Sequence, residues 1–139
     1  MSRIDELPST AARRKTRRNI RLLLLLLLPF VLFALYTWAT LHFVYSTGER
    51  AGVVQKFSRR GWVCKTWEGE LAMTTFPGVA PQIFPFTVRD SAVARQVEQA
   101  VGQNVALSYD QHRGIPGSCF GETEHFVTGV RPVALNFPK

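Results

Sequence analysis

The sequence predicts one transmembrane α-helix followed by a small, mainly β domain. No charged residue occurs in residues 22–48, and most of residues 22–46 are apolar. After this run, short stretches rich in aromatic and β-branched residues are typical of strands. Glycine and proline separate these stretches, as expected of the turns between strands. Together these observations place a membrane anchor before a domain of about 93 residues.

The apolar run and its flanks predict the membrane topology. A helix over residues 22–45 is about 36 Å long, and the hydrocarbon core of a bilayer is about 30 Å thick. Residues 1–21 carry seven basic and two acidic side chains, and basic residues beside a span stay in the cytoplasm. We therefore expect a basic cytoplasmic tail (1–21, its first 12 residues mobile), one span (22–46) and an exported domain (47–139). The alternative is a secretory signal, but residues 37–39 make a poor cleavage site because Trp38 is bulky.

Within residues 47–139 the patterns predict five strands and one short helix. The helix begins after Asp90 or Ser91, and Val93, Val97 and Val101 recur on one of its faces. Gly102 is expected to end it. A turn at 59–61 separates the first two strands, and Gly69 is expected to mark a bulge or a bend in the second. The predicted strands cover residues 49–58, 62–73, 83–90, 104–113 and 125–137.

Three strands, a helix and two strands is the element order of the OB-fold, a five-stranded barrel. We therefore predict an OB-like barrel with one short helix. The alternative is an open α+β sheet with the helix packed on one face. The domain carries ten basic and eight acidic side chains, a surplus too small for a nucleic-acid-binding face, so no nucleic acid is expected as a partner.

Cys64 and Cys119 are the only two cysteines, and an exported domain lies in an oxidising compartment. We expect them to form a disulfide; the alternative is two separate thiols. A C-x-x-C motif is absent, which argues against redox catalysis. The spacing of the cysteines with His112 and His125 fits no zinc pattern, so neither a metal nor a cofactor is expected.

Glu68 and Glu70 lie on one side of the second predicted strand, together with Trp62, Cys64 and Thr66. The two carboxylates are about 6.6 Å apart along a strand, a separation that occurs in glycoside hydrolases. A barrel this small offers little cleft, however. We therefore expect a solvated face balanced by Arg59, Arg60 or Lys65, and we assign no catalytic residue.

Basic and aromatic residues together can bind a polyanion or a sugar-rich polymer through charge and ring stacking. Such residues occur near the second strand and at the end of the fourth. They form the predicted candidate binding face, which consists of Arg59, Arg60, Lys65, Trp67, Tyr109, His112 and Arg113.

Two motifs, YS-x-G-x-RAG-x-x-QKFS-x-x-G from Tyr45 and KTWEGEL from Lys65, resemble a family of small bacterial membrane proteins with one N-terminal span. The similarity covers roughly residues 45–130. It implies an envelope protein anchored in the bacterial inner membrane, with a periplasmic domain, and it transfers no catalytic residue. The architecture is also similar to that of the membrane-anchored haem chaperones. The haem-linking motif of those chaperones is a His with a Tyr four residues later. Here the fourth residue after His125 is Gly129, and the fourth after His112 is Pro116, so the motif is absent and haem attachment is not inferred.

The sequence therefore favours binding over catalysis. We expect a membrane-anchored module of the envelope, with the lipid bilayer and a protein or an envelope polymer as its partners. The alternative is an accessory subunit of a larger membrane complex. A small hydrolase or a redox protein is less favoured.

Overall fold

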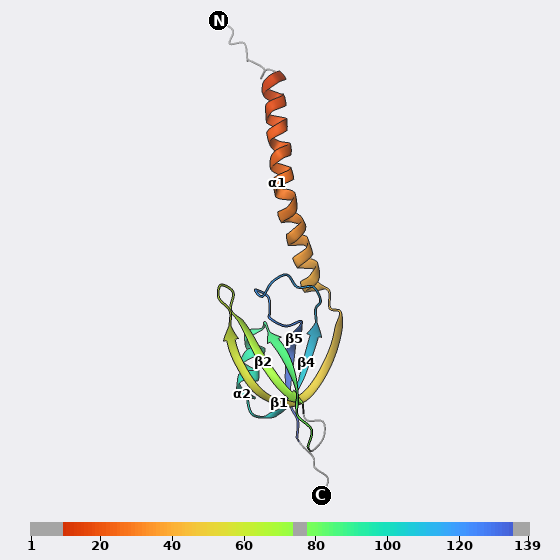
Figure 1. Cartoon of the computed structure of the whole chain (residues 1–139), viewed down its shortest axis with the longest axis vertical. Helices are drawn as coiled ribbons and strands as arrows, with labels where there is room; N and C mark the ends of the chain where they lie inside the picture. The colour runs from red at the N-terminus through yellow and green to blue at the C-terminus, as the bar shows by residue number, and fades with distance from the viewer. Residues whose placement is uncertain (1–9, 74–77, 135–139) are drawn as a thin grey trace. The chain divides into compact units, whose positions relative to one another are not determined.

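The computed structural model describes residues 10–73 and 78–134, and Figure 1 labels its helices and strands. The chain divides between Trp38 and Ala39 into two compact units. Three predictions fall outside the described residues. They are a mobile tail for residues 1–9, part of a loop for 74–77 and the end of the last strand for 135–137.

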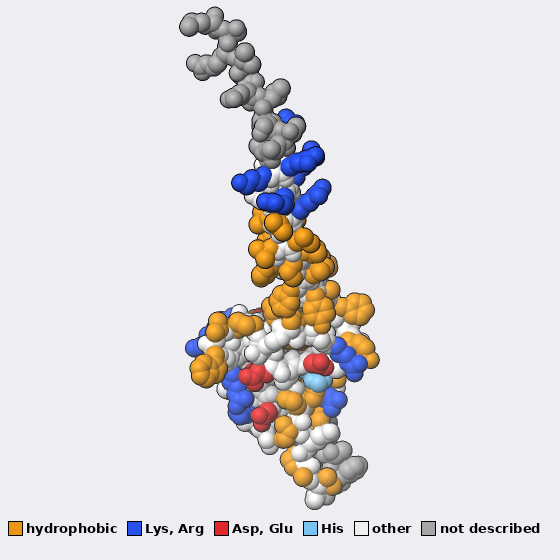
Figure 2. Space-filling model, turned by 45° about the horizontal axis from the view of Figure 1, so that its top comes forward, with side chains coloured by type: hydrophobic (Ala, Val, Ile, Leu, Met, Phe, Trp, Pro, Cys, Tyr) orange, Lys and Arg blue, Asp and Glu red, His pale blue; other side chains and the backbone are white. Residues whose placement is uncertain are grey.

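The first long element is helix α1, Thr10–His42. Its segment Arg13–His42 has a mean hydropathy of 2.4 and is long and apolar enough to cross a membrane. In Figure 2 a band of basic side chains precedes the apolar side chains along this helix. The predicted end at residue 46 is wrong. The helix ends at His42 because Tyr45 already donates its backbone N–H to the carbonyl of Gln111 (2.8 Å).

The second unit contains five strands and one helix in the predicted order. They are β1 (Ser46–Arg60), β2 (Thr66–Met73), β3 (Gln82–Val88), α2 (Ser91–Gln99), β4 (Asn104–Gln111) and β5 (His125–Pro132). The strands close into a barrel in the order β1-β2-β3-β5-β4. This confirms the predicted five-stranded barrel with one short helix and excludes the open sheet.

Strand β1 belongs to both halves of the barrel. Its residues 46–53 pair with β4, and its residues 53–60 pair with β2. The register shifts between Val54 and Lys56, and a bulge of this kind bends a strand. A parallel contact between Thr87 of β3 and Phe126 of β5 completes the closure.

Gly69 serves a different purpose from the bulge or bend that was predicted. A Cβ atom at this position would come within 2.3 Å of the ring of Phe86, which is fully buried. Gly69 therefore leaves room for an aromatic side chain in the core, and the bulge lies in β1 instead.

The core lies inside the barrel and under α2. Asp90 caps α2, because its Oδ1 accepts the backbone N–H of Ala92 (2.7 Å). Val93 and Val97 are buried as predicted, but Val101 is exposed because the helix ends at Gln99. The core cluster consists of Val54, Leu71, Phe84, Phe86, Val88, Val93, Ala94, Val97, Ala100, Val105, Leu107 and Val127.

The start of β2 differs from the prediction by four residues. β1 continues to Arg60, which pairs with Thr66, so the turn falls on residues 61–65. Gly61 makes this turn with a φ of 130°. Trp62 and Cys64 therefore lie in the turn and not on the face of β2 that carries Glu68. The remaining strands end two or more residues before their predicted ends.

Candidate functional site

A disulfide joins two loops of the barrel. Cys64 in the loop of residues 61–65 is bonded to Cys119 in the loop of residues 112–124, with their Cα atoms 4.8 Å apart. The predicted pair is confirmed. In barrels of this type the loops between the first and second strands, and between the fourth and fifth, border the ligand-binding surface. Here these two loops are covalently joined.

A buried carboxylate on β2 holds the second of these loops, residues 112–124. Glu68 is only 7% exposed, so the expectation that it lies on a solvated face is wrong. Its Oε1 accepts hydrogen bonds from the hydroxyl of Thr66 (2.7 Å) and from the backbone N–H of Glu122 (3.1 Å). Its Oε2 accepts a hydrogen bond from the hydroxyl of Thr87 (2.7 Å). Buried polar groups need such partners, and these bonds hold the 112–124 loop against the barrel.

Glu70 does not take the predicted partners either. Its carboxylate lies 3.7 Å from the ammonium group of Lys56 on β1, and both side chains are exposed. The two carboxylates of β2 therefore have separate roles, one in a buried network and one in a surface ion pair. Nothing in this arrangement joins them in one catalytic site.

The turn of residues 61–65 exposes two apolar side chains. Trp62 is 102% exposed and Val63 is 94% exposed. We call these two residues the loop tip. The sequence did not predict this tip, because Trp62 and Val63 fit the pattern of a strand, in which one of them would face the barrel. The signal was present: Gly61 and a disulfide-forming Cys64 bracket the pair.

The first part of the predicted binding face lies beside the loop tip. Arg59 lies over the ring of Trp67, 5.7 Å from its centroid, and Trp67 stacks on Phe57 at 5.3 Å. Trp67 is half-buried and packs against the core. Arg60 forms an exposed ion pair with Glu122 (3.7 Å), and Lys65 is exposed.

The second part of the predicted face is divided. Tyr109 packs against the core and contacts the ring of Phe84 (5.1 Å). Arg113 lies over the ring of Tyr45 at 4.2 Å. His112 is 7% exposed, and its Nδ1 lies 3.0 Å from the carbonyl oxygen of Thr40. The seven residues therefore form separate groups on the barrel.

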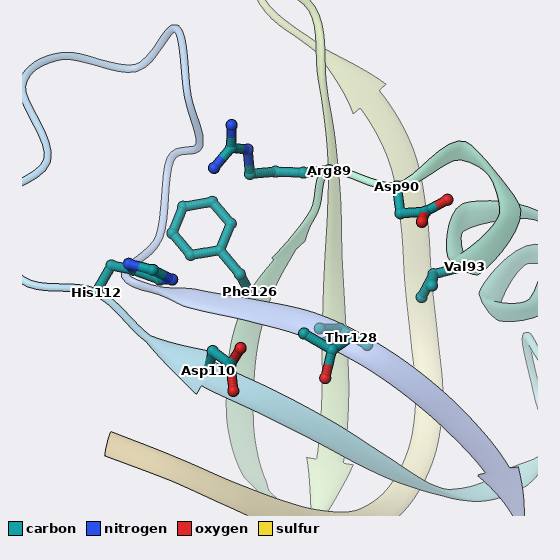
Figure 3. A pocket seen from close by; sticks show the side chains of 8 residues that line it. Arg89, Asp90, Val93, Asp110, His112, Phe126 and Thr128 are labelled. Atoms are coloured by element: carbon teal, nitrogen blue, oxygen red, sulfur yellow. The ribbon is translucent and has the colours of Figure 1, made fainter. Parts of the chain in front are cut away.

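His112 borders an open pocket of about 450 Å³ (Figure 3). The pocket lies beside β4, the start of β5 and the start of α2. Asp110 and Thr128 come from β4 and β5, and Arg89 lies over the ring of Phe126 (5.6 Å). The sequence did not predict this pocket, because only the fold brings residues 89, 110 and 126 together.

A third group surrounds His125 at the start of β5. Its ring contacts Phe84 (4.7 Å) and Tyr109 (5.3 Å), and the guanidinium of Arg50 lies over Phe84 (4.7 Å). Burial lowers the pKa of His125 below its ordinary value, and the nearby positive charge of Arg50 lowers it further. The negative charge of Glu124 raises the pKa of His125, against these two effects.

Within residues 10–73 and 78–134, no three His, Cys, Asp or Glu side chains are placed to hold a metal ion. Fold and site thus define a disulfide-bonded barrel domain that follows a helix able to span a membrane. Residues 44–132 match a family described as a domain of unknown function, DUF8785. Because the match covers more than half of the chain, the chain belongs to this family. No curated protein matches the sequence.

Proposed function

We propose that this protein is a membrane-anchored binding module of the bacterial envelope, and that its barrel binds a protein partner through the loop tip. One observation carries this proposal: Trp62 and Val63 are almost completely exposed on a loop that is fixed in place. The disulfide at Cys64 joins this loop to the loop of residues 112–124, which the hydrogen bond from Glu122 to Glu68 holds against the barrel. A restrained tip loses little conformational freedom on binding, which favours affinity.

The composition around the tip favours a protein over an envelope polymer. Tryptophan and arginine are the residues most enriched at the energetic centres of protein interfaces. Arg59 and Arg60 precede the tip, and Lys65 follows it. Val63 adds apolar area that a sugar-rich polymer would not require. Within the predicted binding face, we assign the contact to the group around Arg59 and Trp67.

We further propose that the N-terminus is cytoplasmic and that the barrel lies in the periplasm, next to the inner membrane. The surplus of positive charge in residues 1–21 supports this orientation. The Cys64–Cys119 bond supports an oxidising compartment. The resemblance to single-span envelope proteins supports a bacterial membrane.

Site-specific photo-crosslinking in whole cells tests the partner. A photoreactive amino acid replaces Trp62 in one strain and the exposed Arg95 of α2 in a control strain. We expect one discrete protein adduct from position 62 and none from position 95. Adducts with lipid or with glycan alone from position 62 would refute the protein partner. Adducts from positions in the span, but not from the tip, would favour a membrane-complex subunit.

Two sets of variants separate binding from folding. Trp62→Ser with Val63→Ser removes the exposed apolar area, and Arg59→Glu with Arg60→Glu reverses the neighbouring charge. Exposed substitutions usually change stability by less than about 0.5 kcal/mol, so all variants should unfold close to the wild-type temperature. We expect both sets to weaken crosslinking from a second probe at Lys65. Unchanged crosslinking in the tip variant would exclude the tip as the interface.

A further inference from the structure

The pocket beside His112 is separate from the loop tip, and its chemistry points to a ligand of its own. The lining residues are Arg89, Asp90, Val93, Asp110, His112, Phe126, Val127 and Thr128. Its volume of about 450 Å³ lies in the range of small-molecule sites, about 300–1,000 Å³. Phe126 and Val93 are buried and form the apolar base of the pocket. The polar residues around them come from three different elements.

Two charges of opposite sign in this pocket have no ion-pair partner among the described residues. The guanidinium of Arg89 lies over the ring of Phe126, and none of the three ion pairs of the described chain includes it. Asp110 is half-buried on β4, and no described side chain forms an ion pair or a hydrogen bond with its carboxylate. A half-buried carboxylate is stabilised when a cation binds it.

The other polar side chains of the pocket already form hydrogen bonds within the chain. Asp90 uses Oδ1 to cap α2, and the hydroxyl of Thr128 donates to the carbonyl of Ser108 (3.3 Å). His112 faces the carbonyl oxygen of Thr40 with Nδ1. A carbonyl oxygen only accepts, so Nδ1 donates in this hydrogen bond. Asp110 thus offers acceptors to a ligand, and Arg89 offers donors.

We infer that this pocket binds a small zwitterion, an amino acid or a short peptide with free termini. Its ammonium group pairs with Asp110 and its carboxylate pairs with Arg89; Figure 3 shows both of these side chains among those that line the pocket. A simple anion would meet the negative charges of Asp90 and Asp110. A simple cation would meet the positive charge of Arg89. A ligand that carries both charges complements the pocket.

The experiment titrates the full chain, in lipid nanodiscs, with three peptides. Alanyl-alanine carries both charges, its N-acetyl derivative lacks the cation, and its C-terminal amide lacks the anion. Binding is followed by the NMR signals of Phe126 and His112. We expect alanyl-alanine to bind, and each capped peptide to bind at least about tenfold more weakly, since a charge-assisted hydrogen bond is lost. Equal binding of all three peptides, or no binding of any, would overturn the inference.

Three variants assign each charge to its partner. Asp110→Asn should abolish the discrimination against the acetylated peptide, and Arg89→Gln should abolish the discrimination against the amide. Arg95→Gln, on the exposed face of α2, is the matched control and should bind like the wild type. If both pocket variants keep the full discrimination, the site lies elsewhere. If a pocket variant fails to fold, the comparison of the three peptides on the wild-type chain still decides the question.

Discussion

Glu68 lies beneath the loop of residues 112–124 and accepts three hydrogen bonds there. Two come from the hydroxyls of Thr66 and Thr87, and one comes from the backbone N–H of Glu122. The hydroxyl of Thr87 also lies 2.9 Å from that of Thr123, which extends the network into the loop. At the scale of single residues, this carboxylate links the wall of the barrel to the loop that carries the disulfide.

We expect Glu68→Ala to lower the free energy of unfolding by about 2–3 kcal/mol, because it leaves buried donors without an acceptor. Glu70→Ala, two residues along the same strand, is the matched control. It removes only an exposed ion pair with Lys56, so it should cost less than about 1 kcal/mol. Denaturant unfolding of the purified chain measures both changes. Similar losses for the two variants would contradict a structural role for the Glu68 network.

His125 should make the stability depend on pH in a predictable direction. Its pKa in the folded chain is lowered by burial and by Arg50, while the unfolded chain titrates near 6.5. The unfolded state therefore binds the proton more readily. Above about pH 6.5 His125 is neutral in both states and has no effect. As the pH falls from there through the folded pKa, stability is lost.

The test compares unfolding temperatures of the wild type and His125→Gln between about pH 7.5 and about pH 5. The wild type should lose stability toward acid, and the variant should lose less, since it lacks the titrating ring. A variant whose stability falls as steeply as that of the wild type would assign the acid sensitivity to other groups.

At the scale of elements, the connection between the loops of residues 61–65 and 112–124 organises one region of the barrel. The first loop is a tight turn between β1 and β2, and the second is the long connection between β4 and β5. The disulfide links the two loops directly. Glu68 of β2 and Arg60 of β1 both bind Glu122, so the second loop is also held against the strands that flank the first. The loop tip is therefore held in place by the disulfide at Cys64.

The Cys64–Cys119 bond should contribute substantially to stability. It closes a sequence separation of 55 residues, for which the loop-entropy estimate is about 4 kcal/mol. We expect Cys64→Ala with Cys119→Ala to lose about 2–4 kcal/mol, since residual structure in the unfolded chain reduces the effect. Mass analysis after alkylation under non-reducing conditions checks the bond in cells. Two alkylated cysteines in the wild type would show that the bond does not form there.

At the scale of the whole molecule, the charge distribution divides the chain. Residues 1–21 hold a surplus of five positive charges, and residues 47–139 hold a surplus of two. The helix between them is long and apolar enough to cross a membrane. Because basic residues near a span are retained in the cytoplasm, this asymmetry favours an exported barrel.

A reporter enzyme that is active only after export, fused behind Lys139, should therefore be active. A reporter that works only in the cytoplasm should be inactive at the same position. Replacing Arg13, Arg14, Lys15, Arg17 and Arg18 by Gln should lower the active fraction, because the charge asymmetry is then mostly removed. Activity of the cytoplasmic reporter in the wild-type fusion would reverse the proposed topology.

The sequence by itself determined the features that depend on local pattern. The uninterrupted apolar run predicted α1, and the four-residue spacing of Val93 and Val97 predicted α2. Alternation predicted β4, and the order of the elements predicted the barrel. Two cysteines in a domain expected to be exported predicted their bond. Each of these signals lies within a few residues along the chain or follows from composition.

Only the tertiary structure decided which side chains are buried and which lie together. Glu68 and Glu70 look equivalent on the strand, but only Glu68 is covered by the 112–124 loop, where it accepts a hydrogen bond from the backbone N–H of Glu122. Trp62 is exposed because β1 pairs as far as Arg60 and moves the turn forward. The pocket of Arg89, Asp110 and Phe126 joins residues that are distant in sequence. Barrel closure brings these groups together, and no local pattern encodes such long-range contacts.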